Sequence, residues 1–201
     1  MPQSYVPVLA VRVQGRKALY AAPRLRGEPY SYAMPPASVV ERAMGSIFGK
    51  PEIEYEARRC NLYSPIRYQT TKESAMASRT TSERTIRTVT SLVDPHYIFE
   101  FAIRVSPLRA RREDTPQKYE EMFRRRIKRG DYRQIPYLGW REYMVDCELV
   151  EGPIPKPLPI TMDLGSMLFD QIPIDVWADR FEPVFWNARI ENGVLHYPQE
   201  I

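Results

Sequence analysis

The sequence predicts an α+β domain with a ferredoxin-like order of elements and a small β-rich C-terminal extension. Two segments, residues 37–50 and 115–130, place apolar side chains at helical spacing, and β-rich segments lie before and after each of them. The order strand, helix, two strands, helix, strand is that of the split βαβ arrangement. The 201 residues, of which 43% are hydrophobic and 27% charged, are enough for one domain with a proper core.

The first third of the chain predicts a strand, a loop, a helix and a second strand. Residues 6–20, "VPVLAVRVQGRKALY", are β-rich and partly alternating, which is typical of a strand. A loop follows over residues 21–36. Residues 37–50 carry apolar side chains at helical spacing, and Gly49 is suited to ending that helix. Residues 51–62, "PEIEYEARRCNL", alternate and predict the next strand.

The middle of the chain predicts an extended pair of strands with a mobile turn. The pair spans residues 66–104, and the small polar residues in its middle, "TKESAMASRTTSERT", indicate a hairpin tip. Residues 96–105, "HYIFEFAIRV", form the clearest strand in the sequence. Their apolar side chains fill one face and part of the other, so we expect this strand to be well buried.

Residues 115–130 predict the second helix, which is rich in arginine. Thr115 is a good N-cap, Pro116 suits the first helical position, and Gly130 fits the left-handed conformation that ends many helices. The apolar stripe of this helix consists of Tyr119, Met122, Phe123 and Ile127. The basic residues that lie largely off the stripe are Arg124, Arg125, Arg126, Lys128 and Arg129.

The last third predicts one more strand and then the extension. Residues 135–151, "IPYLGWREYMVDCELVE", read as the final strand of the domain. The segment after it has many prolines and short apolar runs, which favours a small β-rich extension over a second full domain. We therefore expect a ferredoxin-like domain over residues 1–150 and the extension over residues 151–201.

Charge is distributed unevenly along the chain. Residues 1–108 carry 15 Lys/Arg and nine Asp/Glu, and residues 109–133 carry ten and five. Residues 134–201, by contrast, carry four Lys/Arg and eleven Asp/Glu. A basic front half and an acidic end favour a polyanion as the partner of the front half. The alternative is an ordinary solvated surface of mixed charge, and charge alone does not separate the two.

Several classes of protein are disfavoured by the composition. No stretch approaches the roughly 20 apolar residues of a membrane span, and the first ten residues do not resemble a signal peptide. Cys60 and Cys147, the only cysteines, make neither a metal cluster nor a disulfide framework. We therefore expect a cytoplasmic protein with reduced thiols, no metal and no cofactor.

Short motifs occur in a fixed order over residues 16–150. Around the first predicted helix these are Ser31-Tyr32, Pro35, Ser46-Ile47-Phe48 and Lys50-Pro51. After the arginine-rich helix they are Gly130, Arg133, Leu138-Gly139 and Arg141-Glu142. In this order and spacing they resemble the CRISPR-associated RAMP proteins of the Cas-five group, subtype I-C.

The resemblance implies a ferredoxin-like RAMP domain, RRM-like in plan, that binds RNA. Proteins of this group cut precursor CRISPR RNA beside its repeat hairpin without a metal ion. They then hold the 5′ handle of the guide RNA in the Cascade complex, beside the large subunit and the backbone subunits, and meet target DNA through that complex. The implied partners of this chain are therefore repeat RNA and those subunits.

The resemblance also implies where a catalytic site lies. The group cuts with a tyrosine, a lysine and a histidine. Here the lysine position is Lys118, the histidine position holds Tyr119, and the tyrosine position holds Phe48. Lys118 and Tyr119 are therefore the candidate catalytic residues. Because two of the three positions differ, the resemblance supports RNA binding more strongly than cleavage.

Metal-free RNA cleavage needs a base for the 2′-hydroxyl, a cation for the phosphorane and an acid for the 5′-oxygen. Lys118 can supply the cation. Phe48 has no proton to transfer, and Tyr119 is a poor base because tyrosine ionises near pH 10. Histidine suits both transfers, but the sequence has only two. His96 could approach the helix through the sheet, whereas His196 reads as a surface or packing residue.

The candidate RNA-binding residues lie in two segments, and each has a structural alternative. In the first loop, stacking and phosphate contacts are expected from Arg24, Arg26, Tyr30 and Tyr32. In and after the second helix, phosphate contacts are expected from Arg124, Arg125, Lys128, Arg129 and Arg133. The alternatives are a merely structural loop, a solvated helical face and, for Tyr119, core packing.

Three functions remain open at this stage. The first is a guide-RNA endoribonuclease that stays bound in the effector complex. The second is a non-catalytic Cascade subunit that only caps the 5′ handle. The third is a basic protein-interaction module without an RNA partner.

Overall fold

The computed structural model describes residues 8–23, 28–76, 84–109, 113–175 and 180–199. Within these ranges the elements are, in chain order, β1 (Val8–Gly15), β2 (Lys17–Ala18), α1 (Ala37–Ile47), β3 (Ile53–Leu62), β4 (Tyr68–Met76), β5 (Arg84–Val93), β6 (His96–Val105), α2 (Pro116–Arg129), β7 (Val145–Leu149), β8 (Met162–Asp175), β9 (Arg180–Glu191) and β10 (Val194–His196).

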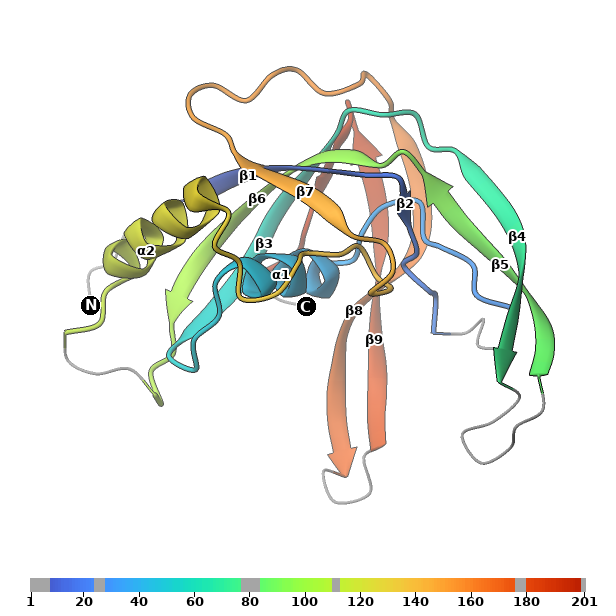
Figure 1. Ribbon diagram of the computed structural model, residues 1–201, viewed down its shortest axis with the longest axis horizontal. Helices are drawn as coiled ribbons and strands as arrows, with labels where there is room; N and C mark the ends of the chain where they lie inside the picture. Colours follow the sequence, from blue (N-terminus) through green and yellow to red (C-terminus); the bar gives the residue numbers. More distant parts are fainter. Residues whose placement is uncertain (1–7, 24–27, 77–83, 110–112, 176–179, 200–201) are drawn as a thin grey trace.

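One antiparallel sheet carries both helices on one face (Figure 1). Its strand order is β7-β1-β6-β3-β10-β9-β8. In the first four strands, β6 lies between β1 and β3, and α1 and α2 form the two crossover connections. This is the split βαβ topology, so the predicted ferredoxin-like α+β fold is confirmed.

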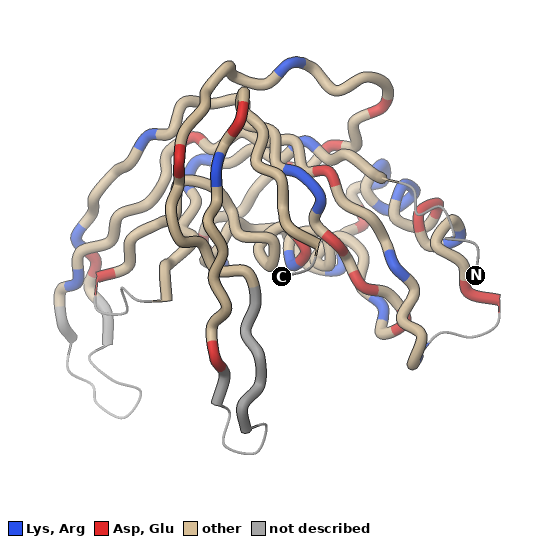
Figure 2. Tube along the Cα trace, turned by 180° about the vertical axis from the view of Figure 1, so that it is seen from behind, with Lys and Arg blue, Asp and Glu red and all other residues tan. Residues whose placement is uncertain are grey.

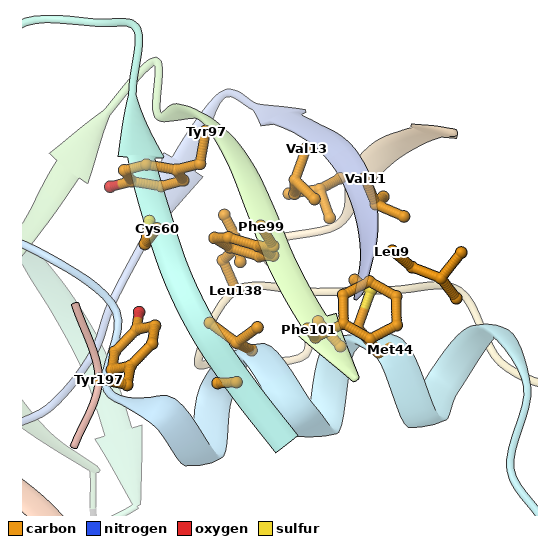
Figure 3. Packing of buried hydrophobic residues seen from close by; sticks show 14 of the residues in the cluster. Leu9, Val11, Val13, Met44, Cys60, Tyr97, Phe99, Phe101, Leu138 and Tyr197 are labelled. Carbon is orange, nitrogen blue, oxygen red and sulfur yellow. The ribbon is translucent and has the colours of Figure 1, made fainter. Parts of the chain in front are cut away.

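The core lies between this sheet and the two helices. On β1 the side chains alternate between buried and more exposed positions, as expected of a strand with one covered face. Strand β6 is buried at seven consecutive positions, Tyr97–Ile103, so its prediction as a well-buried strand is also correct. Figure 3 shows the packed side chains, among them Leu9, Val11, Val13, Met44, Cys60, Tyr97, Phe99, Phe101, Leu138 and Tyr197.

A second, smaller sheet has the order β2-β5-β4. It confirms the predicted extended pair. The hairpin tip expected over residues 71–85 was too long, because residues 71–76 belong to β4 and residues 84–85 to β5. The rest of the expected tip, residues 77–83, lies outside the described residues. The first predicted strand was too long, because the chain leaves the main sheet after Gly15. A Cβ at Gly15 would lie 2.6 Å from the Val145 side chain, and the next pairing, Lys17 with Val93, belongs to the second sheet.

The prediction of one strand over residues 135–151 was wrong for its first half. Only Val145–Leu149 forms a strand, β7. Before it, the Leu138 carbonyl accepts a hydrogen bond from the Leu19 N–H at 3.1 Å. The next residue, Gly139, turns with φ +85°. The backbone here therefore closes onto an earlier loop instead of pairing with a neighbouring strand.

The C-terminal extension is β-rich, as predicted, but its strands are longer than the short apolar runs suggest. β8 and β9 have 14 and 12 residues and pair along their lengths. Strand β10 joins them to β3, so the extension widens the main sheet. The boundary between residues 150 and 151 stays a prediction.

Candidate functional site

The start of α2 is fixed by the caps that its sequence predicts. The Thr115 hydroxyl accepts a hydrogen bond from the Lys118 backbone N–H at 3.2 Å, and Pro116 follows as the first helical residue. The helix ends at Gly130, whose φ is +65°. These caps satisfy backbone groups that would otherwise lack partners, and they set the direction in which Lys118 leaves the helix.

The apolar stripe of α2 packs on the sheet as predicted, with Tyr119, Phe123 and Ile127 buried. Phe123 contacts Phe101 of β6, with ring centroids 5.3 Å apart, and Tyr55 of β3, at 6.1 Å. Because this stripe anchors the helix, the basic side chains of α2 are left at its outer faces.

The end of α1 meets the start of α2. Phe48, which ends α1, and Tyr119 have ring centroids 6.4 Å apart. Both side chains are buried, each with 3% of its surface exposed. The Tyr55 hydroxyl donates a hydrogen bond to the Phe48 carbonyl and so holds this turn in place. The three positions that the resemblance implies, Phe48, Lys118 and Tyr119, therefore lie together.

The Lys118 side chain is accessible to solvent and is held in place by an ion pair with Asp114. This side chain is 46% exposed, and its Nζ lies 2.9 Å from Oδ1 of Asp114, whose side chain is 4% exposed. The same Nζ lies 5.6 Å from the ring centroid of Tyr119. A buried carboxylate thus orients an accessible ammonium group, which remains able to approach an anion from solvent.

The burial of Tyr119 agrees with the core-packing alternative for this residue. Its ring packs against Phe48 and also lies close to the Lys118 ammonium group. Arg126 covers the other ring of the pair, with its guanidinium carbon 5.9 Å from the Phe48 centroid. Phe48 and Tyr119 therefore form a buried aromatic pair beside Lys118, and little of either ring is accessible to solvent.

Neither histidine lies beside Lys118. His96 begins β6, and α2 follows the other end of that strand, nine residues or about 30 Å away. Burial, and then the charge of Arg12, lower the pKa of His96, whose ring packs on Tyr63. His196 is exposed on β10, opposite Arg59 of β3. The expectation that His96 could approach the helix start through the sheet is therefore wrong.

The predicted phosphate-binding residues of α2 fall into two sets. Arg124 is paired with Glu120 at 2.8 Å and Lys128 with Glu151 at 2.5 Å. Arg125 is exposed and has no side-chain partner among the described residues, and the same holds for Arg129. Figure 2 shows these basic positions of α2 interspersed with acidic ones. Arg125 and Arg129 are thus the α2 arginines of the predicted set that are open to an anion.

Lys118, Arg125 and Arg129 lie on one line along α2. A helix turns by 100° per residue, so positions seven and eleven residues beyond Lys118 point within about 20° of it. The line spans about 16 Å along the helix axis. Three cations in a row of this length can follow the backbone of a nucleic-acid strand.

The candidates in the first loop are separated from this row. Arg24 and Arg26 lie outside the described residues. Tyr30 is 43% exposed and packs on Tyr68, with ring centroids 5.2 Å apart, whereas Tyr32 is half-buried against the core. Tyr68 begins β4, and Figure 1 shows β4 in the second sheet, at the end of the molecule away from α2.

Arg133 lies in an open cleft at the end of α1, with a volume of about 600 Å³. Three further basic residues line this cleft, and the sequence reasoning missed them: Arg42, Lys50 and Arg109. No local signal could have found this group, because its members are spread over 92 residues. The exposed row on α2, by contrast, follows from helical spacing alone.

The sequence matches known proteins over almost its whole length. The family model of CRISPR-associated Cas5 proteins, in its Cas5d form, matches residues 8–197. The chain belongs to the Cas5d family. It is 31% identical to the "CRISPR pre-crRNA endoribonuclease Cas5d" of Thermus thermophilus, over 96% of this chain and 92% of that protein. It is 25% identical to the protein of the same name from Mannheimia succiniciproducens, over 94% of each.

Solved structures share the fold of this chain. A structure titled a CRISPR-associated protein matches with a TM-score of 0.72 and 21% identity, over 96% of this chain and 92% of the other. A chain of a CRISPR RNA-guided surveillance complex matches with a TM-score of 0.55 and 10% identity, over 94% and 91%. At these identities the likeness concerns the fold.

No group of three or more His, Cys, Asp or Glu side chains that could hold a metal ion occurs among the described residues. Within the same ranges, no helix is long and apolar enough to cross a membrane.

Proposed function

We propose that this chain binds CRISPR repeat RNA and cuts it beside the repeat hairpin without a metal ion. It then holds the 5′ handle of the product as a subunit of a type I-C Cascade. Support comes from the Cas5d-family match and from two relatives named as pre-crRNA endoribonucleases. The observation on which the proposal rests is the accessible, oriented Lys118 at the junction of α1 and α2.

The proposed reaction is an attack of the RNA on itself. The 2′-oxygen next to the cut forms a bond to phosphorus, and the bond from phosphorus to the 5′-oxygen breaks. The products are a 2′,3′-cyclic phosphate and a 5′-hydroxyl. The 2′-hydroxyl loses its proton to solvent or to a nucleobase of the RNA. The leaving 5′-oxygen gains a proton. Lys118 stabilises the charge that grows on the phosphorane oxygens, and the Tyr119 phenol is the candidate proton donor.

The row of Lys118, Arg125 and Arg129 gives the RNA its path along α2. Each side chain is exposed, so it can contact phosphate without burying an unpaired charge. Lys118 stands at the start of the row, beside Tyr119, whose ring contacts Phe48. This position places the cut at one end of the bound strand. Arg124 and Lys128 are paired with carboxylates, as Lys118 is with Asp114, so at these positions RNA has to compete with the carboxylate. Arg125 and Arg129 have no such competitor among the described residues.

A direct experiment is incubation of the purified protein with its cognate repeat RNA in EDTA. A single cut at the hairpin base, with a cyclic phosphate on the upstream product, is the expected result. Binding without cleavage would remove the nuclease activity from the proposal and leave RNA retention.

A non-catalytic subunit that caps the 5′ handle is the second candidate, and one observation favours it. Phe48 has no transferable proton and Tyr119 is 3% exposed, so both aromatic positions of the implied site are poorly placed for proton transfer. In this case another protein makes the cut, and the row on α2 serves only to hold the product.

The proposed partners follow from the same function. The backbone and large subunits of Cascade would contact the chain while it holds the handle, and target DNA would reach it through the complex. A chain of a CRISPR RNA-guided surveillance complex shares its fold. We place this assembly in the cytoplasm, where Cys60 and Cys147, both free in the structure, stay reduced.

A further inference from the structure

The open cleft at the end of α1 has a strongly one-sided charge. It is lined by Arg42 of α1, Lys50 of the loop after α1, Arg109 of the loop after β6, and Arg133 of the loop after α2. None of the described residues that line it is acidic. One helix and three loops that are distant in sequence thus deliver four cations to one concave surface.

These four cations have no counter-charge among the described residues. Each is exposed, and none has an ion pair or a side-chain hydrogen bond with another residue in the described ranges. Eleven other basic side chains in the described part of the chain are paired with carboxylates. Like charges gathered without counter-charges repel one another, so a bound anion would stabilise this cluster.

The cleft is built on a rigid frame. The backbone N–H groups of Arg133 and Gln134 donate hydrogen bonds to the carbonyls of Ile47 and Ser46 at 3.2 and 2.9 Å, so this loop is attached to the end of α1. The Arg133 guanidinium lies over Gly49, where a Cβ would approach its Nη1 to 2.7 Å. The negative end of the α1 dipole accounts for one nearby cation, but not for four.

The cleft adjoins the candidate cleavage site. Gly49 and Lys50 line the cleft and directly follow Phe48, which packs on Tyr119. Tyr55 also lines the cleft, and its hydroxyl holds the Phe48 carbonyl. The cleft and Lys118 are therefore connected through Phe48, whose chain neighbours line the cleft and whose ring contacts the residue that follows Lys118.

We infer that this cleft binds backbone phosphates of the RNA strand on the far side of the cut from the α2 row. The inference rests on the proposed function, because it takes repeat RNA as the ligand. Arg42, Lys50, Arg109 and Arg133 hold the strand there, while Arg125 and Arg129 hold it on the other side of Lys118. With contacts on both sides, the strand is fixed across the scissile phosphate. Such positioning of the reacting groups contributes to rate as well as to affinity.

The test compares two double variants of equal charge change. Lys50→Ala/Arg109→Ala removes two cations of the cleft, and Arg141→Ala/Lys156→Ala removes two exposed cations that do not line it. All four side chains are exposed, so melting temperatures close to that of the unchanged protein are expected for both. Binding of labelled repeat RNA is measured by fluorescence anisotropy over a range of salt concentrations.

The cleft variant should bind repeat RNA about tenfold more weakly at about 0.1 M salt. Its slope of log K against log salt should be shallower by about 1.4, because each single-strand phosphate that is no longer neutralised lowers the slope by about 0.7. The control variant should stay within about twofold of the unchanged protein and keep its slope. In an ethylation-interference experiment, ethylation of the phosphates that contact the cleft should weaken binding of the unchanged protein. Ethylation of the same phosphates should no longer weaken binding of the cleft variant.

Failure of the proposed function and failure of the cleft inference give different results. If the unchanged protein does not bind repeat RNA, the proposed function fails and this inference fails with it. If the unchanged protein binds but the cleft variant matches the control in affinity, slope and interference pattern, only the inference is overturned. Normal RNA binding with lost assembly into the complex would instead assign the cleft to a protein partner, which also overturns it.

Discussion

Replacement of Lys118 by alanine should separate cleavage from binding. The change removes the accessible cation at the junction of α1 and α2, while leaving the arginines of the row on α2 in place. If Lys118 stabilises the phosphorane, its loss should slow cleavage by about 10²- to 10³-fold, as for removal of a single oxyanion-stabilising group. Affinity should fall only about two- to fivefold, because several other cations still neutralise the RNA phosphates.

The variant should also remain folded. Lys118 is 46% exposed but Asp114 only 4%, so removing Lys118 takes this counter-charge from a buried carboxylate and should cost about 1 to 2 kcal/mol. For a chain of this size that corresponds to a drop in melting temperature of about 2 to 8 °C. Retained binding, measured by anisotropy on the same preparation, would confirm that the loss of activity is local.

Single-turnover cleavage in EDTA is the appropriate assay, with two controls. Lys118→Arg keeps the positive charge and should retain part of the rate, whereas Lys156→Ala removes an exposed lysine elsewhere and should change neither rate nor affinity. Equal losses of cleavage and binding in Lys118→Ala would show that Lys118 is a binding residue only. Cleavage at the unchanged rate would refute its role altogether.

Three further predictions concern other parts of the chain. Phe48→Tyr combined with Tyr119→His restores the residues that the family resemblance implies. We expect cleavage to rise by about 10²-fold, with a pH dependence centred near 6.5, and an unchanged rate would show that other groups limit the reaction. Gly139→Ala should destabilise the fold by more than about 3 kcal/mol in urea titrations. Gly139 has a φ of +85°, and a Cβ there would lie 1.7 Å from the backbone oxygen of Leu19. Gly130→Ala, with φ +65° and nothing within 4 Å, is the matched control and should cost about 1 kcal/mol; equal losses would contradict the role of the close approach. Burial raises the pKa of the Cys147 thiol from its usual value of 9.0 to about 12. Its contribution to stability is therefore complete below pH 9 and is lost as the pH rises through about 12. Cys147→Ala should flatten the decline of stability above about pH 9, and an unchanged slope would argue against the burial effect.

The sequence by itself determined the elements whose local patterns are strong. The caps and apolar stripe of α2 are encoded within 16 consecutive residues, and the structure has them where predicted. The ferredoxin-like order follows from the succession of periodic segments, because few topologies accommodate that succession. Ordered motifs over residues 16–150 were also enough to indicate the family that the comparisons then identified.

Other features required the folded chain. The predicted end of the first strand and the predicted start of β7 were both wrong. Both positions are set by long-range backbone contacts, such as that between Leu19 and Leu138. Burial of Phe48 and Tyr119 against each other is likewise a contact between residues 71 positions apart. The periodic spacing of apolar residues in a sequence does not indicate which segments contact one another in the folded chain.

The basic surfaces show the same division between sequence and tertiary structure. The row on α2 is a matter of helical spacing, so the sequence indicated it, although only the structure shows which of its arginines are already paired with carboxylates. The cationic cleft brings Arg42, Lys50, Arg109 and Arg133 together from one helix and three loops. Local spacing determines a helix and its faces, whereas the meeting of four distant cations is decided by how the helices and loops pack on the sheet.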